Sequence, residues 1–281
     1  MREIEVSRIG KAIEDACGQM ATVYSADIIR RIRSAAETET LPRAQSALNM
    51  LVKNAEIAEQ ESIPICQDTG MVIVFLKVGQ DVHFTGGLLT DAIQEGVRRG
   101  YTENYLRASV VDDPLYDRKN TKDNTPAVIH TEITGGDQVE IELMAKGFGS
   151  ENKSAVRMCT PAEGEEGIIR FVLDTIAAAG PNACPPFIVG VGIGGTFDSC
   201  ARLSKKALMR PLDEDSSDPR YADLERRLLQ KANELNIGPM GMHGRTTALK
   251  IQIEYEPTHI AGMPCAVNMC CHVCRHAKAV I

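Results

Sequence analysis

Apolar residues recur at steps of three and four along much of the first 60 residues, which is the spacing of one buried helix face. Ser25 stands before residues 26–39, where its hydroxyl could cap the first turn of a helix. Pro42 then precedes a second stretch with helical spacing over residues 43–61. We therefore predict that the N-terminal region is helical.

Short apolar runs and helical stretches alternate from residue 70 onward. Strands are predicted at residues 71–79, 186–195, 247–256 and 264–271, with two more inside 127–147 that are joined by a Gly-Gly turn. Helices are predicted at residues 88–105, 164–178, 198–209 and 221–235. This mixture predicts an α/β (mixed α+β) fold with sheets flanked by helices. The loop predicted at residues 213–219 is too short to separate domains, so we expect a single domain over residues 1–281.

The composition excludes several classes of protein. With 281 residues, of which 43% are hydrophobic and 25% charged, the chain has the composition of an ordinary globular protein. Its net charge of −7 argues against a general nucleic-acid surface. It contains no long apolar run, and its first 20 residues alternate charged with apolar positions. We therefore expect no membrane span and no signal peptide, and a cytoplasmic location.

Nine cysteines are many for a reducing compartment, where structural disulfides are disfavoured. The sequence does not contain two CxxC motifs, so spacing alone does not identify a metal site. Four stretches place cysteine or glycine beside polar residues at predicted strand edges: CQDTG (66–70), KGFGSENK (146–153), NACPP (182–186) and CCHVCRH (270–276). Three of them also have another interpretation, namely a buried thiol beside a turn for CQDTG, a proline stop signal for NACPP and half of a zinc site for CCHVCRH.

Taken in this order, the four stretches resemble the class I fumarate hydratases, which are iron-sulfur enzymes that interconvert fumarate and L-malate. The resemblance covers nearly the whole chain, including GVGIGGTFDSCARLSKKAL (190–208) and AVNMCCHVCRHA (266–277). It implies a hydro-lyase of the tricarboxylic acid cycle with the fold of the family's N-terminal domain. Because the chain ends at Ile281, just after the last motif, it is similar to the alpha subunit of the two-subunit form.

That resemblance also implies partners and leaves alternatives open. A separate beta subunit would supply the proton-transferring residue, in a hetero-oligomer of two alpha and two beta subunits. The alpha subunit of L(+)-tartrate dehydratase is a relative with the same type of cluster, so it is the first alternative. A metal-stabilised assembly subunit without catalytic activity is the second.

The resemblance implies a 4Fe-4S cluster held by three cysteines, which the motifs place at Cys66, Cys184 and Cys271. Three ligands on four irons leave one iron open to act as a Lewis acid on the substrate hydroxyl. Cys270 and Cys274 lie beside Cys271 and are alternatives for the third ligand.

Substrate contacts are implied at several of the same motifs. Gln67 and Asp68 follow Cys66 and would face the substrate. Arg107, in NYLRASVV, matches an arginine that holds a substrate carboxylate, a group that a planar guanidinium can bind through two hydrogen bonds. Without the resemblance, Arg107 would be interpreted as half of a surface salt bridge.

Two further substrate contacts are implied in the second half of the chain. Gly149, in KGFGSEN, matches a glycine whose backbone lies against the substrate, where a Cβ atom would obstruct close approach. His259, in EPTHIAGMP, matches a histidine at the substrate site that can be supplied across a dimer interface. We expect Asp68, Arg107 and His259 to take part in catalysis. GIGGT (192–196) lacks the features of a nucleotide-binding loop.

Overall fold

The computed structural model describes all 281 residues, which form two compact units. The first unit consists of residues 1–25, 55–148 and 275–281, and the second of residues 26–54 and 149–274. Helices and mixed sheets occur together, so the predicted α/β fold class is confirmed. The expectation of one catalytic domain over the whole chain stays a prediction. None of the helices combines the length and the apolar character needed to cross a bilayer.

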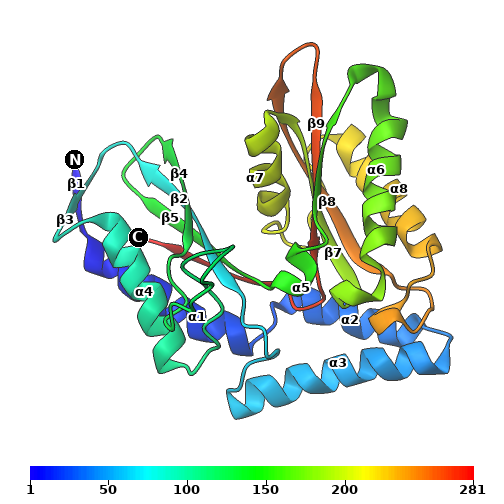
Figure 1. The fold of residues 1–281 in the computed structure, drawn as a ribbon, viewed down its shortest axis with the longest axis horizontal. Helices are drawn as coiled ribbons and strands as arrows, with labels where there is room; N and C mark the ends of the chain where they lie inside the picture. The colour runs from blue at the N-terminus through cyan, green and yellow to red at the C-terminus, as the bar shows by residue number, and fades with distance from the viewer. The chain divides into compact units, whose positions relative to one another are not determined.

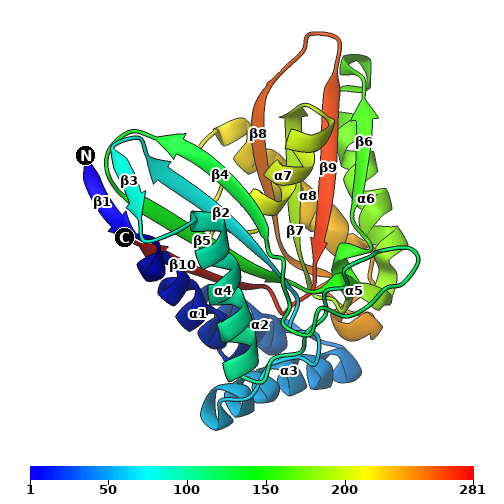
Figure 2. The same cartoon turned by 60° about the vertical axis from the view of Figure 1, so that its left-hand side comes forward.

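The first unit contains a four-stranded sheet, a pair of short strands and two helices. Its elements are β1 (Arg2–Glu5), α1 (Val6–Thr22), β2 (Met71–Gly79), β3 (Val82–Thr85), α4 (Leu89–Glu103), β4 (Val128–Thr134), β5 (Val139–Lys146) and β10 (Arg275–Val280). The order in the sheet is β10-β5-β2-β4, and β1 pairs with β3 in parallel (Figure 2). Apolar side chains of α1 and α4 share one core with β2 and β5, so the two helices cover one face of this sheet.

The position of β2 corrects one expectation about the first sheet. The two strands that flank the Gly-Gly turn both exist as β4 and β5, but β2 lies between them, parallel to β4 and antiparallel to β5. Seven of the nine residues of β2 are buried. A strand this apolar is stable in the middle of a sheet, and β2 therefore lies between two strands that are neighbours in sequence.

The second unit contains a four-stranded sheet with helices on both faces. Its strands are β6 (Ala155–Cys159), β7 (Phe187–Gly195), β8 (Ala248–Thr258) and β9 (Met263–Cys270), and its helices are α2 (Ala26–Thr38), α6 (Gly164–Ala179), α7 (Phe197–Ala207) and α8 (Pro219–Glu234). Three short 3-10 helices, η1 (Pro161–Glu163), η2 (Gly180–Ala183) and η3 (Pro239–Gly241), complete it. Two further helices, α3 (Pro42–Glu61) and α5 (Phe148–Glu151), cross the boundaries between the units in sequence.

The second sheet has the order β6-β9-β7-β8, with α6 and α8 on one face and α7 on the other (Figure 1). Apolar residues of β7 at alternate positions from 187 to 193 face the core under α6 and α8. Gly190 and Gly192 occupy the other face, against α7. A Cβ atom at Gly192 would lie 2.1 Å from the carbonyl oxygen of Cys200, so the glycines allow the α7 backbone to approach the sheet.

Most predicted elements are found within a few residues of their expected bounds, but the predicted capping of one helix is wrong. Ser25 does precede α2, yet its buried hydroxyl has no hydrogen-bond partner and therefore does not cap the helix. β1, β3, β6 and β10 were not predicted at all. β10 lies in the cysteine-rich C-terminal region and pairs with β5 through residues 275–280.

The close packing of α7 on β7 leads to a stability prediction. Gly192→Ala should lower the free energy of unfolding by about 1–3 kcal/mol, because the added methyl group forces the α7 backbone away from the sheet. Gly135→Ala is the matched control, since a Cβ atom there meets no atom within 4 Å. Urea unfolding of both variants measures the difference. Equal stability of the two variants would show that α7 can move without cost.

Candidate functional site

The nine cysteines differ in their exposure. Cys184 is exposed, and Cys66 and Cys271 are half-buried. All the others are buried, namely Cys17, Cys159, Cys200, Cys265, Cys270 and Cys274. The three accessible cysteines are thus the three that the motifs identify as cluster ligands.

Burial also affects the chemistry of four of the remaining thiols. It raises the pKa of Cys17 to about 12, and it raises the pKa of Cys159, Cys200 and Cys265 as well. A metal binds the thiolate and not the thiol, so a thiol with a raised pKa is a poor ligand at neutral pH. These four cysteines are therefore suited to packing.

Cys184 and Cys271 lie at the same end of the second sheet. Cys184 stands just before β7, and Cys271 directly follows β9. Because β7 and β9 are antiparallel, with Ile188 opposite Cys270, the start of one strand lies beside the end of the other. The amide of His272 donates a hydrogen bond to the carbonyl oxygen of Cys184 at 3.3 Å. The fold of the second unit thus brings two of the three predicted ligands together.

The backbone at Cys184 is unusual. Its φ of 54° and ψ of 67° place it in the left-handed region, which residues other than glycine seldom adopt. Residues in that region cost free energy and are concentrated at functional sites. The short helix η2 ends one residue earlier, at Ala183, so the exposed Cys184 stands at a turn and not inside an element.

Cys270, Cys271 and Cys274 are the candidates for the third ligand, and they differ in their surroundings. Cys270 is the last residue of β9 and is buried. The thiol of Cys274 is also buried and donates to the carbonyl oxygen of Leu208 at 3.9 Å. Cys271 alone of the three is partly accessible. Its accessibility favours Cys271 as the third ligand.

In the first unit, Asp68 organises the turn that follows Cys66. Its Oδ1 accepts a hydrogen bond from the amide of Gly70 at 3.0 Å, and its Oδ2 accepts one from the amide of Phe148 at 2.9 Å. Its carbonyl oxygen accepts a bond of 2.6 Å from the buried guanidinium of Arg275. Asp68 therefore ties the CQDTG turn to the start of KGFGSEN and to β10. Beside it, the Cys66 thiol donates to Oε1 of the exposed Gln67 at 3.4 Å.

Arg107 lies in the same part of the first unit. The hydroxyl of Thr69 donates to the carbonyl oxygen of Arg107 at 3.1 Å, and the hydroxyl of the buried Tyr101 donates to the carbonyl oxygen of Thr69 at 2.8 Å. The Arg107 side chain is exposed, and no carboxylate pairs with it, unlike many other arginines of the chain. The alternative of a surface salt bridge at Arg107 is therefore not supported.

Asn124 is a residue of this region that the sequence analysis missed. It is fully buried, and its φ of 60° is one that asparagine tolerates better than most residues. Its Nδ2 donates to the carbonyl oxygen of Gly70 at 3.0 Å, and its Oδ1 accepts from the amide of Ser109 at 2.8 Å. Asn124 thus links the CQDTG turn to the segment that contains Arg107. The only sequence signal for it is an asparagine in the turn-like run KDNTP.

Gly149 belongs to the second unit and is exposed. A Cβ atom at this position would meet no atom of the protein within 4 Å, so packing within the chain does not require glycine here. The open space beside its backbone is compatible with the expected approach of a ligand.

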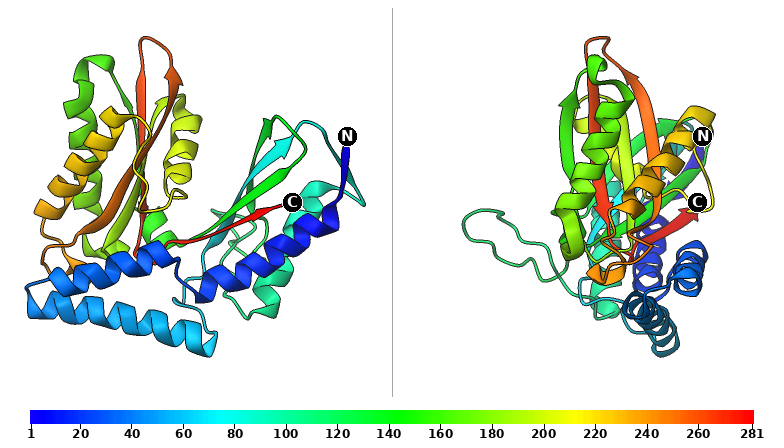
Figure 3. Two further views of the ribbon diagram at one scale, coloured as in Figure 1. Left: turned by 180° about the vertical axis from the view of Figure 1, so that it is seen from behind. Right: turned by 90° about the vertical axis from the view of Figure 1, so that its right-hand side faces the viewer.

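His259 lies at the other end of the second sheet from Cys184 and Cys271. It follows β8 in the hairpin that leads to β9, where its Nδ1 accepts from the amide of Ala261 at 3.2 Å. Figure 3 shows this hairpin at one end of the sheet. At about 3.3 Å per residue, the eight residues of β9 separate its two ends by about 23 Å. Within its own second unit, His259 therefore does not join the two cysteines. The GIGGT glycines lie at this end of β7 too, away from Cys184.

No three His, Cys, Asp or Glu side chains are grouped as a ready metal site. Cys66 belongs to the first unit, and Cys184 and Cys271 belong to the second. The donor chemistry fits such a group, because thiolates are the soft ligands that iron-sulfur clusters require and these three are the accessible ones.

A family comparison identifies the class of protein. Residues 10–280 match the model of the family described as Fumarate hydratase (Fumerase). The chain belongs to the fumarate hydratase family. It is therefore a hydro-lyase, as the motif resemblance predicted.

Relatives of this fumarate hydratase family member carry a different substrate in their names. A Methanocaldococcus jannaschii protein, provisionally named L(+)-tartrate dehydratase subunit alpha, is 39% identical over 96% of this chain and 96% of its own length. The L(+)-tartrate dehydratase subunits alpha of Escherichia coli and Shigella sonnei are each 29% identical over 98% of this chain and 91% of their own length. The similarity thus extends across both compact units.

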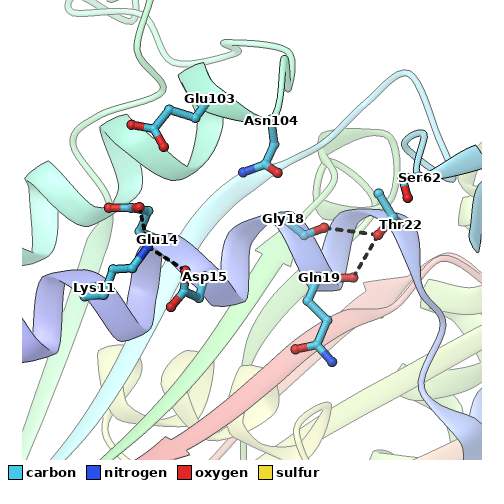
Figure 4. A pocket seen from close by; sticks show the side chains of 9 residues that line it. All are labelled: Lys11, Glu14, Asp15, Gly18, Gln19, Thr22, Ser62, Glu103 and Asn104. Carbon is cyan, nitrogen blue, oxygen red and sulfur yellow. Dashed lines mark hydrogen bonds and ion pairs between the residues drawn. The ribbon is translucent and has the colours of Figure 1, made fainter.

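A separate polar pocket of about 470 Å³ lies between α1 and α4 of the family member's first unit (Figure 4). Three of its four charged groups are paired with one another, since the ammonium of Lys11 contacts Glu14 at 2.7 Å and Asp15 at 2.8 Å. The fourth, Glu103, lies 3.8 Å from Arg99 outside the pocket. None of the predicted site residues lines it. We therefore do not assign the substrate to this pocket.

The contrast in burial predicts how the thiols react. In the metal-free chain at neutral pH, iodoacetamide should label Cys66, Cys184 and Cys271 much faster than the six buried cysteines, because only accessible thiols meet the reagent. Peptide mass spectrometry over time measures the rates. Labelling in guanidinium, where all nine should react, is the control. Labelling of Cys270 or Cys274 as fast as Cys271 would contradict the assignment of accessible thiols.

Proposed function

We propose that this chain is the alpha subunit of a two-subunit iron-sulfur hydro-lyase that interconverts fumarate and L-malate, with residues 1–281 acting as one catalytic domain. The observation that carries the proposal is that the accessible cysteines coincide with the three motif positions, Cys66, Cys184 and Cys271. Membership of the fumarate hydratase family gives the reaction class, and the motifs give the cofactor.

In this proposal, Cys66, Cys184 and Cys271 hold a 4Fe-4S cluster. When bound, the cluster supplies an open iron that acts as a Lewis acid on the substrate hydroxyl. The protein's part is to fix its ligands. The hydrogen bond between His272 and Cys184 supports a fixed spacing of two ligands, and the hydrogen bonds of Asp68 support a fixed turn at the third.

The remaining residues bind and orient a four-carbon dicarboxylate. Arg107 would hold one carboxylate through its unpaired guanidinium, and the open backbone at Gly149 would lie against the substrate. Gln67 and Asp68 would contact the substrate beside the cluster. Because both carboxylate oxygens of Asp68 already accept amide hydrogen bonds, its side chain suits orientation of a hydroxyl better than removal of a proton.

Two roles require other chains. The relatives' names describe subunits alpha, which supports a separate beta subunit here, and we assign the proton-transferring residue to that partner. His259 lies at the opposite end of its own sheet from Cys271, so a role in catalysis would be exercised at the site of a second alpha chain. A hetero-oligomer of two alpha and two beta subunits, located in the cytoplasm and without nucleic-acid partners, meets both requirements.

L(+)-tartrate is the second candidate substrate. The observation that favours it is the name shared by the relatives, which reach 39% identity. Tartrate dehydration uses the same elements, namely an open iron, a held carboxylate and a proton transfer at the neighbouring carbon. The non-catalytic assembly subunit is disfavoured, because the family to which the chain belongs consists of hydro-lyases.

The cofactor assignment predicts a sharp difference between cysteine variants. Serine at position 66, 184 or 271 should remove most of the iron after anaerobic reconstitution, because a hard oxygen ligand poorly replaces a soft thiolate. Cys17→Ser and Cys159→Ser should keep it. Iron and sulfide assays decide the matter. Retention of iron in Cys271→Ser together with its loss in Cys270→Ser or Cys274→Ser would move the third ligand.

The subunit assignment predicts that the reconstituted alpha chain alone is almost inactive. Adding the beta subunit should raise turnover by about 10²- to 10⁴-fold, the usual contribution of a positioned acid or base. Malate formation from fumarate and oxaloacetate formation from L(+)-tartrate are measured at matched iron content. Turnover by the alpha chain alone would refute the two-subunit proposal, and turnover of tartrate without fumarate would select the second candidate.

A further inference from the structure

A polar cluster in the second unit joins residues 149–154 to the strand that leads to Cys271. These residues comprise most of the short helix α5 and the turn after it, and they are called the Gly149 loop below. Glu151 stands at the centre of the cluster, two residues after Gly149. Its Oε1 pairs with the ammonium of Lys205 on α7, and its Oε2 accepts a hydrogen bond of 3.0 Å from Nδ2 of Asn268 on β9. The side chains of Lys205 and Glu151 are only 18% and 22% exposed, so solvent screens this ion pair less than a surface pair.

Ser154 adds a second attachment between the same loop and the same strand. Its hydroxyl oxygen accepts a hydrogen bond of 3.0 Å from the amide of Met269 and one of 3.2 Å from Nδ2 of Asn268. Met269 lies two residues before Cys271 and Asn268 three residues before it. The loop that begins at Gly149 is therefore fixed at two points to the end of β9.

Asn268 shows that this cluster has an energetic cost. The residue is 95% buried, since its exposed fraction is 5%, and its Oδ1 has no hydrogen-bond partner. An unpaired buried acceptor reduces stability, and an apolar residue of similar size would avoid that cost. The neighbours on its own face of β9, Ala266 and Cys270, are indeed apolar and buried. A buried amide at this place is therefore better explained by positioning than by stability.

We propose that Glu151, together with Lys205 and Asn268, is a positioning residue that sets the distance between the Gly149 backbone and Cys271. This inference rests on the proposed function, in which Gly149 contacts the substrate and Cys271 holds the cluster. The cluster of side chains would thereby fix where the substrate lies relative to its Lewis acid. An error of about 1 Å in such a distance can cost about 10²-fold in rate.

Exchanging the carboxylate and the amide tests this inference. Asn268→Asp should place two carboxylates in contact and loosen the loop, whereas the double variant Glu151→Gln with Asn268→Asp restores one amide beside one carboxylate. In the complete alpha-beta complex, we expect Asn268→Asp to raise KM and lower kcat without loss of iron, and the double variant to recover most of both. Glu166→Gln, at an exposed glutamate of α6, is the matched control.

A second readout does not depend on activity. Hydrogen exchange of peptides covering residues 148–154 and 266–271 in the metal-free chain should accelerate in Asn268→Asp and in Lys205→Met, and should return toward wild type in the double variant. Lys205→Met leaves the sheet sequence intact, so it decides the matter if Asn268→Asp fails to fold. Unchanged exchange in both peptides, or a double variant that recovers neither exchange nor KM, overturns the inference. A wild-type complex inactive on both substrates refutes only the proposed function.

Discussion

The antiparallel ladder between β7 and β9 is the interaction on which the candidate site in the second unit depends. It sets Ile188 opposite Cys270 and so brings Cys184 beside Cys271, although the two are 87 positions apart in sequence. Side chains alternate between the two faces of a strand, so a slip of one residue would reverse every side chain of β9. Asn268 would then enter the apolar core under α6 and α8. The penalty for burying its amide there helps to fix the register that places the cysteines.

In the first unit, hydrogen bonds and not a pair of strands hold the predicted site residues in place. The turn after Cys66 has few apolar side chains. Hydrogen bonds between its backbone and the side chains of Asp68, the buried Asn124 and Arg275 hold its conformation. These groups bind backbone atoms, and so they determine where neighbouring side chains point while leaving them accessible. The result is an exposed Gln67 and Arg107 on a well-held backbone, which suits residues that must meet a ligand.

The parts of the fold that could be predicted are those that local pattern determines. The long helices were found because their burial repeats with the helical period, and β7 was found because it is one continuous apolar run that begins after proline and ends in glycines. The central place of β2, the existence of β10 and the missing cap at Ser25 depend on partners far away in sequence, which periodicity does not contain. The same division applies to the site. The cysteines belong to recognisable motifs, whereas Asn124 acts through hydrogen bonds to Gly70 and Ser109 that only the folded chain reveals.

His259 shows how the stiffness of a sheet limits what one chain can do. It lies in the hairpin beyond β8, and β9 separates that hairpin from Cys271 by about 23 Å. A strand paired on both sides, as β9 is with β6 and β7, does not bend enough to close such a distance. Side-chain motion covers only a few ångströms. If His259 contacts a substrate held at the end of the sheet where Cys184 and Cys271 lie, that substrate must therefore be held by another chain.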